Sequence, residues 1–124
     1  MPVIVQRQNE IIINKHPLPP SGLTIGRSVK NDIFLDDASV SQQHAKIEVK
    51  ELKDGSLIYF IIDLESTNHT LVNQQAISEH LLSDQDEIEI GFTQFKYIDE
   101  NKESLAATKQ FKKSWLPGVL VLKN

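Results

Sequence analysis

The chain has 124 residues, the size of one domain with a single hydrophobic core. It contains no cysteine, which excludes disulfides, thiolate metal sites and cysteine nucleophiles and favours the cytoplasm or another reducing intracellular compartment. The net charge of −4 argues against broad electrostatic binding to nucleic acid or to anionic membranes, and no stretch is apolar enough for a signal peptide or a membrane-spanning helix. Any anion must therefore be bound by a local pocket.

Short apolar runs separated by turn residues recur between residues 3 and 98. In several runs apolar and charged residues alternate, as in Ala45–Val49 and Glu87–Ile90, which places apolar side chains on one face of a strand. This spacing predicts an all-β sandwich of two antiparallel sheets. The predicted strands are Val3–Val5, Ile11–Ile13, Leu23–Ile25, Ile33–Leu35, Ala45–Val49, Leu57–Ile62, Thr70–Val72, Glu87–Ile90 and Gln94–Ile98.

Turn chemistry separates these runs. Gln8-Asn9-Glu10 predicts a turn, and the three prolines of Pro17–Gly22 predict irregular backbone. Asp54-Gly55 lies between two apolar runs, which predicts a hairpin.

The pattern changes after Ile98. Residues 101–113 contain one β-branched residue, Thr108, and Ala107, Phe111 and Trp115 lie four apart, which predicts an amphipathic helix. Pro117-Gly118 ends this helix, and the short apolar run at residues 119–122 suits an added strand. We expect residues 1–99 to form the domain and residues 100–124 an extension packed on its surface; a dimer contact, disorder or a linker are the alternatives.

Three short motifs occur in order between Ile25 and Val72: Gly26-Arg27, Ser41-Gln42-Gln43-His44 and Ser66-Thr67-Asn68. Together they resemble the forkhead-associated (FHA) domain, a phosphothreonine-reading module. The resemblance implies an FHA-like β-sandwich that binds phosphorylated peptides through loops at one end. Further matching segments extend it over most of the chain: Leu23–Arg27, Asn31–Ile33, Asp36–Ser41, Asp63-Leu64 and Asp86–Ile88.

A phosphothreonine carries close to two negative charges and three acceptor oxygens, so a reader needs fixed donors on short loops. The resemblance makes Arg27 the chief phosphate ligand, with a guanidinium fork suited to phosphate oxygens. It implies that Ser41 and Gln42 donate to the same phosphate. Thr67 would lie near the phosphate, and the amide of Asn68 would hold the peptide backbone because an amide both donates and accepts.

Other residues of these loops have supporting roles. Gly26 lets the backbone turn sharply before the motif arginine. The resemblance assigns His44 to buried hydrogen bonds that brace the loops, and Asn31 is expected to fix a turn through side-chain to backbone bonds. The candidates for reading flanking peptide positions are Lys30, Glu65 and His69.

The chain departs from the family pattern at three positions that usually hold glycine: His69, Gln74 and Gln85. Such glycines serve left-handed backbone conformations, which cost other residues about 1–2 kcal/mol. We therefore expect shifted loops or strain at these positions. Weaker phosphate affinity is also expected, because Gln42 and Gln43 are neutral where the family often has a cation.

The leading functional prediction is a non-catalytic module that binds phosphothreonine-containing partners of a Ser/Thr kinase. The alternative is a divergent domain that binds a protein without phosphate, through the C-terminal extension or a sheet face; a self-directed variant has phosphorylated Thr108 captured by the pocket. An enzyme is disfavoured because the chain has neither a Gly-x-x-x-x-Gly-Lys loop nor a Gly-x-Ser-x-Gly elbow. No cofactor or metal is expected, since the four histidines lack the spacing of a metal site: His16, His44, His69 and His80.

Overall fold

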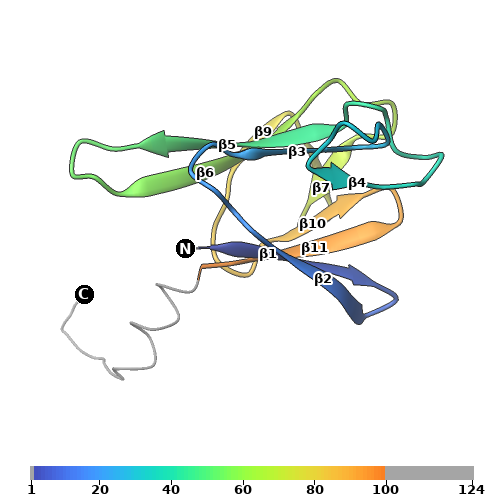
Figure 1. The fold of residues 1–124 in the computed structure, drawn as a ribbon, viewed down its shortest axis with the longest axis horizontal. Helices are drawn as coiled ribbons and strands as arrows, with labels where there is room; N and C mark the ends of the chain where they lie inside the picture. The colour runs from blue at the N-terminus through green and yellow to red at the C-terminus, as the bar shows by residue number, and fades with distance from the viewer. Residues whose placement is uncertain (1, 100–124) are drawn as a thin grey trace.

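The structure is a computed structural model that describes residues 2–99, and it confirms the all-β fold. Eleven strands in this range form two sheets that face each other (Figure 1). In chain order the strands are β1 (Val3–Gln8), β2 (Ile11–Pro17), β3 (Leu23–Gly26), β4 (Ile33–Phe34), β5 (Ala45–Glu51), β6 (Leu57–Asp63), β7 (Thr70–Val72), β8 (Gln75–Ile77), β9 (Glu79–Leu81), β10 (Glu87–Ile90) and β11 (Thr93–Ile98).

The six-stranded sheet has the order β2-β1-β11-β10-β7-β8, and the five-stranded sheet has the order β4-β3-β5-β6-β9. Strands β3 and β4 pair in parallel, whereas the long ladders are antiparallel, such as β5 with β6 and β1 with β11. Each of the nine predicted strands corresponds to one of these elements. Strands β8 and β9 were not predicted, because each is a three-residue segment of mixed polarity.

The core lies between the two sheets and follows the alternation in the sequence. In β10, Ile88 and Ile90 are fully buried, while Glu87 and Glu89 point away from the core. In β11, Phe95 is fully buried between neighbours that are partly exposed. Burial of one such side chain contributes about 1.5–3 kcal/mol to folding, so the alternation sets which face of each strand turns inward.

Strand β2 departs from this pattern because it forms the edge of its sheet. Its isoleucines Ile11, Ile12 and Ile13 are 68%, 59% and 51% exposed.

The predicted helix after residue 100 and the apolar run at 119–122 lie outside the described residues, so the domain boundary at residue 99 stays a prediction. Within residues 2–99 no helix is long and apolar enough to cross a membrane.

The three positions that lack the family's glycine keep a glycine-like backbone. His69, Gln74 and Gln85 have φ of 69°, 71° and 76°, which is the left-handed region. These residues therefore carry the conformational cost of a left-handed backbone. The expectation of strain at these three positions is confirmed.

The carboxylate of Asp86 joins three segments of the chain. It accepts hydrogen bonds from the Asn73 side chain (3.0 Å), from the Ser83 backbone N–H (2.8 Å) and from the His80 ring (3.0 Å). Burial raises the pKa of Asp86, but these hydrogen bonds outweigh burial and hold the pKa below its usual value. The ionised carboxylate is therefore part of the fold.

Replacing the strained residues with glycine should stabilise the protein. Gln74→Gly and Gln85→Gly should each raise the free energy of unfolding by about 0.5–1 kcal/mol, because relief of the left-handed strain exceeds the entropy cost of glycine. Urea denaturation measures this change. Gln75→Gly, in the regular strand β8, is the matched control and should lower the free energy of unfolding. Equal changes in this free energy at all three positions would contradict the claim that Gln74 and Gln85 are strained.

The substitution Asp86→Asn should destabilise the fold in a pH-dependent way. A depressed folded-state pKa gives stability that is present above the unfolded pKa of about 3.9 and is lost as the pH falls through the folded value. The variant should lose about 1.5–3 kcal/mol of unfolding free energy at pH 7. Urea denaturation should show that the difference in unfolding free energy between wild type and variant becomes smaller below pH 4. The exposed Asp36→Asn is the control, and a difference that is constant with pH would contradict the assignment.

Candidate functional site

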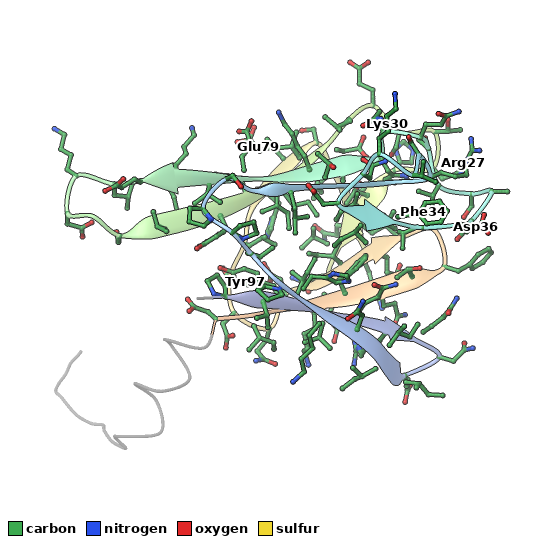
Figure 2. The ribbon with its side chains drawn as sticks, in the orientation of Figure 1. Arg27, Lys30, Phe34, Asp36, Glu79 and Tyr97 are labelled. Atoms are coloured by element: carbon green, nitrogen blue, oxygen red, sulfur yellow. The ribbon has the colours of Figure 1, made fainter. Side chains whose placement is uncertain are left out.

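Three loops meet at one end of the sandwich: residues 27–32 after β3, residues 35–44 before β5, and residues 64–69 after β6. Figure 2 shows Arg27 and Lys30 at this end. Hydrogen bonds join the second loop to the third, among them those from the Thr67 backbone N–H to Ser41 Oγ (3.0 Å) and from Asn68 Nδ2 to the Ser39 carbonyl (2.9 Å). Residues that are far apart in sequence thus form one surface.

Arg27 is anchored at the base of its side chain. Its backbone N–H donates to the Ser41 carbonyl and its Nε donates to the Val40 carbonyl, both at 2.9 Å. Among the described residues no group hydrogen-bonds to the terminal Nη nitrogens, and the residue is exposed. The guanidinium is therefore held in direction while its two terminal nitrogens remain available to an anion.

Ser41 is oriented by the bonds that it already makes. Its Oγ accepts the hydrogen bond from the Thr67 backbone, so the hydroxyl hydrogen is left to donate. Its backbone N–H donates to His44 Nδ1 at 3.0 Å. Ser41 thus offers a second donor next to the anchored arginine.

His44 is fully buried and joins the second and third loops. Its Nδ1 accepts from the Ser41 backbone, so the proton of the neutral ring lies on Nε2, which donates to the His69 carbonyl at 2.9 Å. The ring can fill both roles only as the neutral Nε2–H form. This position and these bonds are what the resemblance implied for His44.

Asn31 and Gly26 bring the first loop against the second. Asn31 Nδ2 donates to the carbonyls of Ser28 (3.0 Å) and Gln42 (2.8 Å). A Cβ at position 26 would lie 2.3 Å from the Gln42 carbonyl oxygen. The structure thus gives Gly26 a different reason from the expected sharp turn: close approach of a neighbouring backbone requires it, and its φ is not positive.

The asparagine and threonine of the third loop lie at its exposed tip. Because one amide hydrogen of Asn68 is used on Ser39, its Oδ1 and second N–H remain available for a peptide unit. Thr67 is exposed and its hydroxyl has no hydrogen-bond partner among residues 2–99. Both side chains can therefore contact a bound peptide.

The base of the third loop depends on Asp63. This carboxylate accepts hydrogen bonds from the Ser66 backbone and hydroxyl and from the Thr70 hydroxyl. Burial raises its pKa, but the hydrogen bonds outweigh burial and lower the pKa overall. The sequence reasoning did not give Asp63 this role.

The second loop is fixed at its start by Asp37. Its carboxylate accepts from the backbone N–H of Phe92 in the β10–β11 turn (3.0 Å) and from the hydroxyl and backbone N–H of Ser39. The hydrogen bond from Phe92 is the largest cause of the lowered pKa of Asp37. A Cβ at Gly91 would lie 2.6 Å from the Asp37 carboxylate. Nothing in the sequence pattern pointed to this contact.

The other predicted residues lie on the same loops with exposed side chains: Gln42, Lys30, Glu65 and His69. Gln42 takes part in the structure through its carbonyl, which accepts from Asn31, and its side-chain amide makes no hydrogen bond within residues 2–99. Glu65 has a left-handed φ of 57°. Whether these side chains touch a peptide stays a prediction.

The chemistry of this end is that of anion and peptide-backbone binding. It offers the free end of one guanidinium, one hydroxyl donor and one free amide on loops fixed by hydrogen bonds. Within residues 2–99 no three histidine or acidic side chains come close enough to hold a metal ion. Both ring nitrogens of His44 are used by backbone groups, so this histidine is not available as a base.

Part of the chain is similar in sequence to other proteins. The chain is 38% identical over 76 residues to an oxoglutarate dehydrogenase inhibitor of Corynebacterium diphtheriae, which covers 61% of this chain and 50% of that protein. The chain thus matches about half the length of this relative.

Two solved structures are similar in fold. One, from an analysis of phosphothreonine-dependent FHA domain interactions, has a TM-score of 0.65 at 25% identity and covers 78% of this chain and 96% of that chain. The other is Mycobacterium tuberculosis EmbR in complex with a low-affinity phosphopeptide, with a TM-score of 0.64 at 33% identity, covering 77% of this chain and 24% of that chain.

The sequence profile of the FHA domain matches residues 23–91, which include all three loops. This range is more than half of the chain. The chain therefore belongs to the FHA domain family.

Proposed function

We propose that this FHA domain is a phosphothreonine-dependent protein-interaction module whose phosphate site is built on Arg27 and Ser41. The observation that carries the proposal is the anchored guanidinium, with its terminal nitrogens free, beside a hydroxyl that is left to donate. Thr67 and Gln42 complete the rim of the site. Asn68 would hold the peptide backbone through its free amide groups.

Phosphopeptide binding would depend on the groups of the site and not on the overall electrostatic field of the protein. Residues 1–99 hold 15 of the 17 acidic residues and 8 of the 13 basic ones, so the domain is strongly acidic. A phosphorylated peptide must be attracted at short range, where each charge-assisted hydrogen bond contributes about 1.5–3 kcal/mol. Only a group with several acceptor oxygens uses all the donors at once.

The partner would be a protein phosphorylated on threonine by a Ser/Thr kinase, and the domain itself would not catalyse a reaction. Support comes from the family, from the solved relatives described for phosphothreonine and phosphopeptide, and from a relative named as an inhibitor. The residues that read flanking positions would be Lys30, Glu65 and His69, which surround the site.

Removing the guanidinium should abolish phosphopeptide binding. In fluorescence anisotropy against a degenerate phosphothreonine peptide library, Arg27→Ala should raise the Kd by about 100-fold or more, since at least two charge-assisted hydrogen bonds are lost. Lys53→Ala, which removes a cation from the far β5–β6 hairpin, should leave the Kd unchanged. The side chain of Arg27 is exposed, so the variant should melt near the wild-type temperature.

The same titrations distinguish the competing function. Unphosphorylated peptides should not bind, and phosphoserine peptides should bind more weakly than phosphothreonine peptides. A folded wild-type protein that binds no phosphothreonine peptide would overturn the proposal and leave the phosphate-independent interaction as the alternative.

Adding a cation beside Ser41 should strengthen binding. Gln42→Arg should lower the Kd for a phosphothreonine peptide by about threefold at low salt, because an exposed ion pair contributes up to about 1 kcal/mol and is screened by salt. The Gln42 side chain makes no hydrogen bond within residues 2–99, so the change costs no structural contact. Gln43→Arg is the control for net charge. An equal gain from both variants, measured by the same anisotropy titration, would show that general charge and not the site is responsible.

A further inference from the structure

A groove of about 490 Å³ lies beside the second loop and is distinct from the proposed phosphate site. We call it the Phe34–Phe92 groove. Residues of β1, of β4 with the start of the second loop, and of the β10–β11 turn line it: Gln6, Gln8, Phe34, Asp36, Asp37 and Phe92 among them. Figure 2 shows Phe34 and Asp36 on the same end of the molecule as Arg27.

Two exposed phenylalanines line the groove, together with mostly polar residues. Phe34 is 48% exposed and Phe92 is 78% exposed, which makes Phe92 the most exposed large apolar side chain of the described residues. Two phenylalanine rings beside a hollow are a common feature of interaction sites. An occupant with its own aromatic side chain would remove both rings from water.

The charge of the groove defines its occupant further. Asp36 and Asp37 contribute two carboxylates, and none of the residues that line the groove is a lysine, arginine or histidine. Asp37 is held in place by its bonds to Ser39 and Phe92, and Asp36 is exposed. The groove therefore matches a segment that combines lysines with aromatic residues.

Residues 109–116 of the same chain have this composition. The segment reads Lys-Gln-Phe-Lys-Lys-Ser-Trp-Leu, with Phe111 and Trp115 four residues apart. Residues 100–124 carry five lysines and two glutamates, a net charge of +3. Because the whole chain has a net charge of −4, residues 1–99 have a net charge of −7. We propose that residues 109–116 dock in the Phe34–Phe92 groove of their own molecule, independently of phosphate.

The geometry of β11 allows this contact within one chain. The strand begins next to Phe92 and ends at Ile98, so the groove lies about 20 Å from the point where the tail leaves the domain. The twelve residues from Glu100 to Phe111 span about 40 Å when extended and about 18 Å as a helix. A tether of this length gives an effective concentration in the millimolar range, so even weak docking populates the bound form.

Other surfaces match this segment less well. The exposed isoleucines of β2 are apolar, yet their strand carries a lysine and no acidic residue. The crevice between β2 and β5 is lined by Lys15 and Lys46 as well as by Asp32 and Glu48, so its charges balance. The Phe34–Phe92 groove alone among these three combines exposed phenylalanines with unbalanced negative charge.

Trp115 is the only tryptophan of the chain, so its fluorescence reports on the tail directly. The experiment measures acrylamide quenching of Trp115 in the full chain and in a synthetic peptide of residues 105–119. We expect a quenching constant at least about twofold lower in the full chain, because the tether keeps the segment docked. Quenching should be independent of protein concentration and should increase with salt.

Paired variants of the full chain test where the segment binds. Phe92→Ser with Asp36→Lys changes two exposed residues of the groove and should raise the quenching constant to that of the peptide. Leu57→Ser with Glu79→Lys makes the same kinds of change away from the groove and should leave the quenching constant low. Glu79 lies in β9 and Phe34 in β4, the two opposite edges of the five-stranded sheet, and Figure 2 shows the two residues well apart. Circular dichroism melting checks that both variants are folded.

Three results would overturn the proposal. The first is quenching in the wild-type chain equal to that of the peptide, which means that the tail is free. The second is protection that survives the groove variant, which places the segment elsewhere on the domain. The third is protection that appears only as the protein concentration rises, which means that a second copy and not the same molecule is the occupant.

Discussion

The two hydrogen bonds of the buried His44 ring hold the site together. One ring nitrogen accepts from Ser41 in the second loop, and the other donates to His69 in the third. Ser41 in turn accepts from the backbone of Arg27 through its carbonyl and from Thr67 through its hydroxyl. The position of Ser41 and of the end of the third loop therefore depends on one imidazole whose two nitrogens have opposite roles.

Three residues with a left-handed backbone occupy positions where the resemblance implies glycine: His69, Gln74 and Gln85. His69 is both a strained residue, with φ of 69°, and the residue whose carbonyl accepts from His44. A relaxed backbone at this position would reorient the carbonyl and remove the acceptor. The cost of about 1–2 kcal/mol at such a residue is thus tolerated where the surrounding hydrogen bonds fix the conformation. At Gln74 and Gln85 the neighbouring strand pairing has the same effect, since the Gln85 backbone N–H bonds to the Tyr97 carbonyl.

Much of the fold could be predicted because local patterns in the sequence indicate the strands. Short apolar runs separated by turn residues located nine strands, several of them with alternating apolar and charged residues, whereas β8 and β9 are too short to show any period. The motif order predicted that Arg27 and Ser41 belong to one site, and the structure brings them together. The contact of Asp37 with Phe92 joins residues 55 positions apart, and the close approach that requires Gly26 comes from a separate loop. Such contacts arise from tertiary packing, so the local sequence around either residue does not predict them.

The second loop links the proposed phosphate site to the Phe34–Phe92 groove. Its first residues, Asp36 and Asp37, line the groove, and its later carbonyls at Ser39 and Val40 fix Asn68 and Arg27. Asp37 also bonds to Ser39, so the two halves of the loop are joined directly. A ligand in the groove would alter phosphopeptide affinity only as far as it binds one arrangement of this loop better than another. The Asp37–Ser39 bonds are the shortest physical route for that difference, because they connect a groove carboxylate to the backbone that positions Asn68.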